Sequence, residues 1–226
     1  MSAKAIVIGN SDGIGLALTR RLLDKGWRVD GISRSPSQVL HQAYSHATAD
    51  VAKPEFPELM RSLLTETPDL CVYCAGIGEL LDPRDMYGEV NIFQVNLMGM
   101  VTAAAMVIPA MVEAGQGHFM GISSMADVLL SAEAPSYHGS KAGFSNYLEG
   151  LARSVRPLGV RVTNVRFGFV DTKMAKGDVK PFMMSVDKAV DHLERCMNRR
   201  PPRYSAPAVM RPLIGLRRLM MNLGLA

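Results

Sequence analysis

The chain has 226 residues, of which 48% are hydrophobic and 20% charged, an ordinary composition for one globular domain that leaves little room for a second. The net charge of +4 is mild and forms no nucleic-acid motif, so we expect no nucleic acid among its partners. Three cysteines are too few for a disulfide framework.

Short apolar runs alternate with amphipathic segments along the chain. The runs at 4–8, 28–32, 45–49, 70–74, 117–122 and 161–167 predict β-strands, with a weaker one at 203–205. Helical periodicity marks 15–25, 55–65, 89–113, 136–156 and 186–197, and an apolar helix with arginines follows at 208–223. This alternation predicts an α/β fold: one domain over residues 1–226, a doubly wound parallel sheet of about seven strands, and helices on both faces.

Several local features indicate ordinary core packing. Cys71 and Cys74 form a C-x-x-C inside a predicted strand, without the second pair of ligands that zinc needs, so we expect no metal site. The segment 90–112 has the length of a membrane span and no charge, but it contains Asn96 and Pro109, and we expect a buried helix. The N-terminus, MSAKAIVIG, has no apolar signal-peptide core, so we expect a cytoplasmic protein.

The turn between the first predicted strand and the first predicted helix is rich in glycine. It reads GNSDGIG, with glycines in a G-x-x-x-G-x-G spacing. Such a turn lets the backbone approach a pyrophosphate, and the N-terminus of the following helix favours the negative charge. We therefore predict a Rossmann-type dinucleotide site whose glycine loop consists of Gly9, Ser11, Asp12, Gly13, Ile14 and Gly15.

The end of the second strand predicts which dinucleotide binds. An NAD(H) site expects an acidic residue there, but this end carries Ser33 and Arg34, which could bond and pair with a 2′-phosphate. Asp30 lies three residues too early, inside the strand, and we interpret it as structural. We therefore expect NADP(H) to be preferred and NAD(H) to remain possible; the negative charge of Asp12 in the glycine loop opposes this preference.

Further motifs follow in order. CAG ends the fourth strand, Asn96 lies in VNLMG, and GISS brings Ser124 to thirteen residues before Tyr137. In YHGSK, Tyr137 and Lys141 lie four residues apart and point within roughly 40° of one another on a helix. That pair alone is a common coincidence. Together with the glycine loop and FGFVDT after the sixth strand, these motifs resemble those of the short-chain dehydrogenase/reductase superfamily over nearly the whole chain.

The resemblance implies a catalytic set of Asn96, Ser124, Tyr137 and Lys141. Tyr137 would exchange a proton with the substrate oxygen, and Lys141 would favour its phenolate and bond the nicotinamide ribose. Ser124 would donate to the same oxygen, and Asn96 would hold a water in a proton relay. Nothing assigns a catalytic role to His138, because it points away from Tyr137 on the helix.

The resemblance also extends the cofactor site beyond the glycine loop. Besides Tyr137 and Lys141, it implies contacts from Asp50, Val51, Cys74, Ala75, Gly76, Gly168, Val170 and Thr172. The chain departs from the family pattern at several positions. Asp127 stands where the family usually has Gly, close to the expected substrate, and Phe167 replaces the Pro of P-G beside the nicotinamide, while Cys74 replaces the Asn of N-A-G.

We therefore expect an oxidoreductase that transfers hydride between NADP(H) and an apolar aldehyde, ketone or secondary alcohol. The alternative is a non-catalytic NADP(H)-binding sensor or scaffold. Residues 172–184, with Met174, Phe182, Met183 and Met184, predict an apolar substrate lid with a hinge at Gly177. The resemblance implies a homodimer or homotetramer through the helices at 89–113 and 136–156. The helix at 208–223 could cap the substrate pocket, contact another subunit or, least favoured, lie on a membrane surface.

Overall fold

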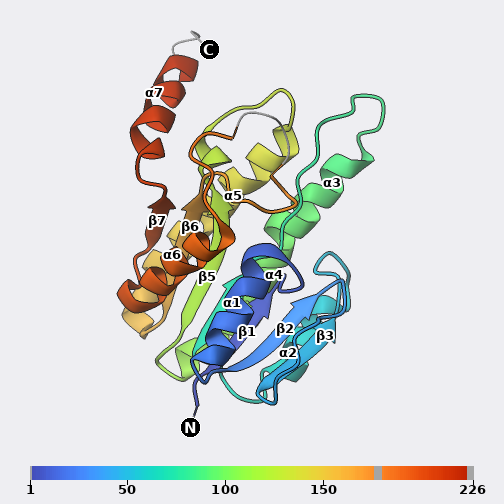
Figure 1. The fold of residues 1–226 in the computed structure, drawn as a ribbon, viewed down its shortest axis with the longest axis vertical. Coiled ribbons are helices and arrows are strands. Elements are labelled where there is room, and N and C mark those ends of the chain that lie inside the picture. The colour runs from blue at the N-terminus through green and yellow to red at the C-terminus, as the bar shows by residue number, and fades with distance from the viewer. Residues whose placement is uncertain (1, 176–179, 223–226) are drawn as a thin grey trace.

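The computed structural model describes residues 2–175 and 180–222, and seven parallel strands form its central sheet (Figure 1). Their order across the sheet is β3-β2-β1-β4-β5-β6-β7. The strands are β1 Lys4–Ile8, β2 Arg28–Ser33, β3 Tyr44–Thr48, β4 Leu70–Tyr73, β5 His118–Ser124, β6 Arg161–Phe167 and β7 Arg203–Ala206. The predicted doubly wound parallel sheet is confirmed. Its order reverses at β1, so the carboxyl ends of β1 and β4 flank the position where such sheets bind ligands.

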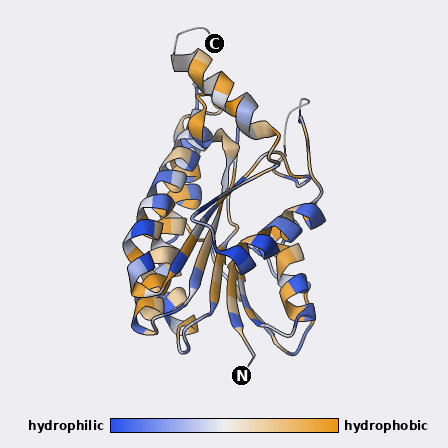
Figure 2. Ribbon diagram, turned by 90° about the vertical axis from the view of Figure 1, so that its left-hand side faces the viewer, coloured by the Kyte–Doolittle hydropathy of each residue, from blue (hydrophilic) through white to orange (hydrophobic). Residues whose placement is uncertain are grey.

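Helices cover both faces of the sheet (Figure 2). One face packs against α2 (Phe56–Leu63), α4 (Gly99–Glu113) and α5 (Pro135–Val155), around a core that includes Phe119 and Phe144. The other packs against α1 (Gly13–Asp24) and α6 (Val186–Arg199), around Leu18, Val165 and Leu193. Cys71 belongs to the first core and Cys74 packs against the second, as residues three apart on a strand should. Both are free thiols.

The predicted helix at 89–113 differs from the prediction in one respect. It begins as α3 (Tyr87–Phe93), passes through a π-helical turn at Gln94–Met98, and continues as α4. A π-turn inserts one extra residue and shifts the hydrogen-bond register, which amphipathic periodicity alone does not show. The stretch Tyr87–Glu113 is long and apolar enough to span a membrane, but core helices share these properties, and half of its most apolar part is buried in the protein.

The ends of the remaining elements differ from the prediction by at most two residues, and the strands at 4–8 and 161–167 have the predicted bounds. The last helix is α7 (Met210–Asn222), which projects from the body at the end of the molecule opposite the N-terminus (Figure 1). Residue 223 of the predicted helix lies outside the described residues. The first residues of α7 pack near the end of β6, because a Cβ at Gly168 would meet the sulfur of Met210.

Candidate active site

The glycine loop lies between β1 and α1, and its geometry requires glycine. Gly9 has a φ of +86°, and a Cβ there would lie 2.5 Å from the backbone nitrogen of Ala75. A Cβ on Gly15 would overlap the carbonyl oxygen of Gly9. Asp12 caps the helix by accepting a 2.8 Å hydrogen bond from the amide of Gly13. The loop therefore presents bare backbone and a helix N-terminus to a ligand.

A second observation also fits a dinucleotide here. The side-chain oxygen of Asn10 is buried, and it has no hydrogen-bond partner among the described residues. A buried acceptor without a donor is costly, and a ligand hydroxyl could satisfy it. These residues fit the pyrophosphate and adenosine portions of a dinucleotide.

The segment after β6 lies over the glycine loop. A Cβ on Gly13 would lie 3.1 Å from the methyl carbon of Thr172, and Lys173 pairs with Asp12 at 2.6 Å. The hydrogen bond from Lys173, with that from Gly13, lowers the pKa of Asp12. A cavity of about 410 Å³ opens here, lined by Asp12, Gly13 and Thr172 among others. Predicted residues from two ends of the chain thus meet at one cavity.

The carboxyl end of β2 carries the residues predicted to choose between NADP(H) and NAD(H). Arg34 is exposed, whereas Ser33 is buried and donates to the carbonyl of Ser35 at 2.8 Å. His46 of β3 lies 3.4 Å from the hydroxyl of Ser33. Asp30 lies within β2, accepts a hydrogen bond from Ser45 and pairs with Lys4.

The predicted adenine contacts lie after β3. Asp50 accepts a 2.9 Å hydrogen bond from the amide of Ala52, and Val51 is buried close to Gly99 of α4. Val51 therefore contributes mainly to the core, with its backbone left to face a ligand. Ala75 and Gly76 continue from β4 beside the glycine loop, as the would-be Cβ of Gly9 shows for Ala75.

The predicted catalytic residues come together around Gly76 and Gly78. A Cβ on Gly76 would lie 3.4 Å from the side-chain oxygen of Asn96 and 3.7 Å from the Nζ of Lys141. A Cβ on Gly78 would lie 3.2 Å from the ring of Tyr137. Tyr137 and Ser124 share a side-chain hydrogen bond. The loop after β4 thus has glycine at both positions that lie against these side chains.

Lys141 is held from two sides. Its ammonium donates to the carbonyl of Ile122 at 3.0 Å and lies 5.9 Å from the centre of the Tyr137 ring. The side chain is buried, and desolvation lowers the pKa of Lys141 to about 8, although Asp127 and Cys74 oppose this shift. The group therefore still carries its charge at neutral pH.

Tyr137 has a pKa above the usual value of a phenol. Burial is the main cause, and the hydrogen bond with Ser124 offsets part of it. We expected Lys141 to favour the phenolate, but the ammonium does not reverse the effect of burial in this arrangement. At neutral pH Tyr137 is a neutral phenol, which can donate a proton.

Asn96 lies in the π-turn and is fully buried. Its amide exchanges two hydrogen bonds with the backbone of Ile77, at 2.8 and 2.9 Å, and donates to Ser140 at 3.1 Å. It therefore ties the loop after β4 to α5. Gly139 and Gly143 allow α5 to pack closely against α3 and the π-turn. A Cβ on Gly139 would press on Phe93, and a Cβ on Gly143 would press on Leu97.

A family profile described as short chain dehydrogenase matches residues 3–181. This chain belongs to the short-chain dehydrogenase family. An uncharacterized oxidoreductase of Myxococcus xanthus is 31% identical over 203 residues, covering 83% of this chain and 80% of the relative. The 3-oxoacyl-[acyl-carrier-protein] reductase FabG of Vibrio cholerae is 30% identical, covering 76% and 75%. It follows that this protein is an NAD(P)-dependent oxidoreductase.

A solved short-chain dehydrogenase from Burkholderia cenocepacia, in complex with NADP, has the same fold. The TM-score is 0.86 at 22% identity, over 99% of this chain and 97% of that one.

Asp127, a position where this short-chain dehydrogenase departs from the family pattern, is buried. We expected Asp127 close to the substrate, but its side chain is only 2% exposed and forms a two-point ion pair with Arg166 of β6. A buried carboxylate needs such a partner, and the partner is 39 residues away in sequence. Phe167 packs its ring into the α6 side of the core, near His192.

The predicted lid of the dehydrogenase is only partly described. Met174 faces the site, since its methyl carbon would lie 3.5 Å from a Cβ on Gly76, and Phe182 and Met183 are about half exposed. Met184, the fourth apolar residue of the predicted lid, is buried and pairs with Val170 through an isolated β-bridge. The proposed hinge at Gly177 lies outside the described residues.

Sequence reasoning missed a group of polar side chains next to the glycine loop. Asn10 donates to the hydroxyl of Tyr44 at 2.7 Å, and that hydroxyl lies 3.0 Å from the Nδ1 of His46. Gly31 leaves room for this contact, because a Cβ there would overlap Asn10. No local motif marks this group, because Asn10 lies in the glycine loop and Tyr44 and His46 lie on β3. The described residues contain no group of three His, Cys, Asp or Glu side chains that could hold a metal ion.

Proposed function

We propose that this protein is an NADPH-dependent carbonyl reductase that uses Tyr137 as its general acid. The observation that carries this proposal is the position of the phenol, hydrogen-bonded to Ser124 and beside Lys141, with a pKa raised above the usual range by burial. A protonated phenol next to a second hydroxyl donor is suited to a carbonyl oxygen that becomes an alcohol.

Each residue of the site has a distinct task in this scheme. The bound cofactor supplies the hydride. Tyr137 donates a proton to the substrate oxygen, and Ser124 donates a hydrogen bond to the same atom as negative charge develops there. Lys141 holds a positive charge beside them and is placed to bond the nicotinamide ribose. Asn96 orders the loop after β4, and a water beside it would connect Lys141 to solvent.

The NADP(H) preference rests on the end of β2. Arg34 is exposed and available for a 2′-phosphate, no carboxylate follows Ser33 at this end, and His46 offers a further polar group. The Burkholderia relative carries NADP in its structure. The charge of Asp12 is largely satisfied by Lys173, which reduces its repulsion of the cofactor phosphates.

The substrate is an apolar aldehyde or ketone, and the protein works as an oligomer. Met174 lies beside the site, and Phe182 and Met183 expose further apolar side chains in the same predicted lid. Tyr87, Val90 and Phe93 of α3 expose apolar side chains, with 83% of Tyr87 accessible, and this face suits a second copy in a homodimer or homotetramer. A membrane contact through α7 is not part of the proposal, and the cytoplasm stays the predicted location.

Turnover of a carbonyl panel with NADPH separates this reductase from the alternative sensor or scaffold. We expect reduction of medium-chain aldehydes or ketones by the wild type and a loss of at least about 100-fold in Tyr137→Phe. Tyr147→Phe, on the same helix, is the matched control and should keep its activity. Full turnover by Tyr137→Phe would refute the proposed mechanism, and NADPH binding without turnover would favour the scaffold.

The cofactor assignment has a separate test. Arg34→Ala should weaken NADPH binding by about tenfold while leaving NADH unchanged, because only NADPH carries the 2′-phosphate. Arg61→Ala, an exposed arginine of α2, should change neither affinity. A wild type that prefers NADH, with no response to Arg34→Ala, would overturn the assignment.

A further inference from the structure

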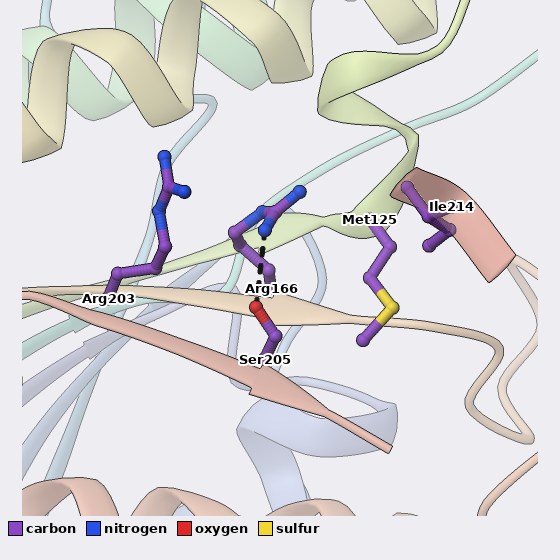
Figure 3. Close-up of a pocket in the computed structure, with 5 residues that line it drawn as sticks. All are labelled: Met125, Arg166, Arg203, Ser205 and Ile214. Carbon is purple, nitrogen blue, oxygen red and sulfur yellow. Dashed lines mark hydrogen bonds between the residues drawn. The ribbon is translucent and has the colours of Figure 1, made fainter. Parts of the chain in front are cut away.

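A buried ion pair joins Arg166 of β6 to Asp127 in the turn Met125–Val128. Arg166 of β6 donates from its Nε to one carboxylate oxygen of Asp127 at 2.6 Å and from a second nitrogen to the other oxygen. Its third nitrogen donates to Ser205 of β7 at 3.2 Å (Figure 3). The side chain of Asp127 is 2% exposed and that of Arg166 is 11% exposed. The guanidinium therefore has a partner for each of its three nitrogens and holds Asp127 in one orientation.

The same carboxylate continues toward the catalytic lysine. Ser145 donates to Asp127 at 2.5 Å and lies 2.8 Å from the hydroxyl of Ser123. Ser123 in turn donates to the backbone carbonyl of Lys141 at 3.4 Å. Ser145 lies one helical turn beyond Lys141 on α5, so the chain of contacts fixes the part of α5 from which the lysine projects.

The carboxylate of Asp127 also interacts electrostatically with the ammonium of Lys141. The titratable groups that face Lys141 are Cys74 from the end of β4, Tyr137 from α5 and Asp127 from the turn Met125–Val128. Burial lowers the pKa of Lys141 to about 8, and Asp127 is the first of the groups that oppose it. Cys74 carries no charge at neutral pH, since burial raises the pKa of its thiol to about 12. Asp127, which is paired with Arg166, is thus the only carboxylic acid side chain of the three.

We propose that Asp127, held in place by Arg166, is a positioning residue that orders α5 through Ser145 and Ser123 and turns its carboxylate group toward the Lys141 ammonium. This inference deepens the proposed function and rests on it for the role of Lys141. It concerns a position where the family usually has Gly, so the device is a property of this chain. A buried carboxylate group needs a cation as its partner, and Arg166 supplies it.

The test compares one neutral double variant with a matched control pair. Asp127→Asn alone leaves Arg166 buried without a counter-charge and could fail to fold. Asp127→Asn/Arg166→Gln removes both charges and keeps hydrogen-bonding side chains, so it serves as the decisive variant. The control is Arg28→Gln/Glu66→Gln, which removes an exposed ion pair between β2 and the segment after α2.

The readout is the titration of Lys141 itself, by NMR of ¹³Cε-labelled lysine in the full chain, assigned with Lys141→Gln. We expect the midpoint of the double variant to fall about one pH unit below that of the wild type, and the control pair to leave it unchanged. A folded double variant with the wild-type midpoint would overturn the inference. An equal shift in the control pair would overturn it too, because the effect would then not be specific to Asp127.

Activity provides the second readout and keeps the two proposals separable. In NADPH-dependent reduction, the alkaline limb of kcat/KM should move down in pH with the Lys141 midpoint, whereas a merely structural defect would lower kcat/KM equally at all pH values. A wild type without turnover would refute the proposed function, and the NMR titration would still decide the role of Asp127, because it needs no substrate.

Discussion

The hydroxyl of Tyr73, the last residue of β4, donates a 2.6 Å hydrogen bond to the carbonyl of Val95 in the π-turn. A π-turn disturbs the regular ladder of backbone hydrogen bonds, and Tyr73 satisfies a carbonyl there. Gly99 is required beside this bond, because a Cβ at that position would overlap the Tyr73 hydroxyl. The position of Asn96, one residue after Val95, therefore depends on a fully buried tyrosine beneath the helix.

Removing that hydroxyl should loosen the site. Tyr73→Phe leaves the Val95 carbonyl buried without this donor, so we expect the free energy of unfolding to fall by about 1–3 kcal/mol. Urea denaturation measures it. Tyr147→Phe, whose side chain is only partly buried, should change stability by less than about 0.5 kcal/mol. Equal effects of the two substitutions would show that the Tyr73–Val95 bond has no special role.

The buried ammonium of Lys141 should lower the free energy of unfolding of the protein. Its pKa falls from 10.5 to about 8 in the folded state, so the folded ammonium costs about 3 kcal/mol below pH 8, and this cost disappears as the pH rises toward 10.5. Lys141→Met should therefore unfold at higher urea concentration at pH 7. We expect its free energy of unfolding to rise by about 2 kcal/mol, after allowance for the lost hydrogen bond to Ile122. The variant should also lose activity.

The exposed Lys188→Met is the control for this change, and it should alter neither stability nor turnover. A destabilised Lys141→Met would contradict the desolvation of Lys141. The wild type should also gain stability between pH 8 and 10.5 through this residue, while Lys141→Met should lack that gain.

His118 predicts an acid-sensitive core. Burial, with Arg200 and Arg161 nearby, lowers its pKa to about 3, and the neutral ring bonds Thr163 at 2.8 Å. The unfolded state takes up a proton near pH 6.5, whereas the folded state does not, so stability is full above pH 6.5 and falls below it by up to about 1.4 kcal/mol per pH unit. His118→Gln should flatten this dependence between pH 6.5 and 5, measured by thermal unfolding. The exposed His41→Gln should keep the wild-type slope.

The carboxylate of Asp12 should weaken the binding of NADPH to the glycine loop. Its carboxylate caps α1 and pairs with Lys173 next to the expected phosphates. Asp12→Asn keeps a capping side chain, removes the negative charge and frees Lys173, so NADPH should bind about threefold to tenfold more tightly. Isothermal titration calorimetry gives the affinity. Asp24→Asn at the other end of α1 should have no effect, and weaker binding in Asp12→Asn would mean that the carboxylate contributes to the site.

Local pattern was sufficient for the strands, the glycine loop and the spacing of Ser124, Tyr137 and Lys141. Strand and helix periodicities involve residues within one or two turns, and the positive φ of Gly9 and the close contact of Gly15 with the Gly9 carbonyl arise in a single turn. The topology follows from these elements, since parallel strands joined by helices permit few arrangements. The family pattern then assigned expected roles to Asn96, Ser124, Tyr137 and Lys141.

Pairings across the sheet required the tertiary structure. Asp127 looked like a substrate-facing residue in sequence, and only the fold brings Arg166 to it from β6. The hydrogen bond of Asn10 with Tyr44, which continues to His46, joins the glycine loop to β3. The π-turn at Asn96 depends on Tyr73 below it. The amino-acid sequence by itself determined which elements form and where a dinucleotide and a proton donor could lie. The tertiary structure alone decided which buried charges and polar groups are paired, because burial gives a polar side chain its cost and only the packed fold supplies its partner.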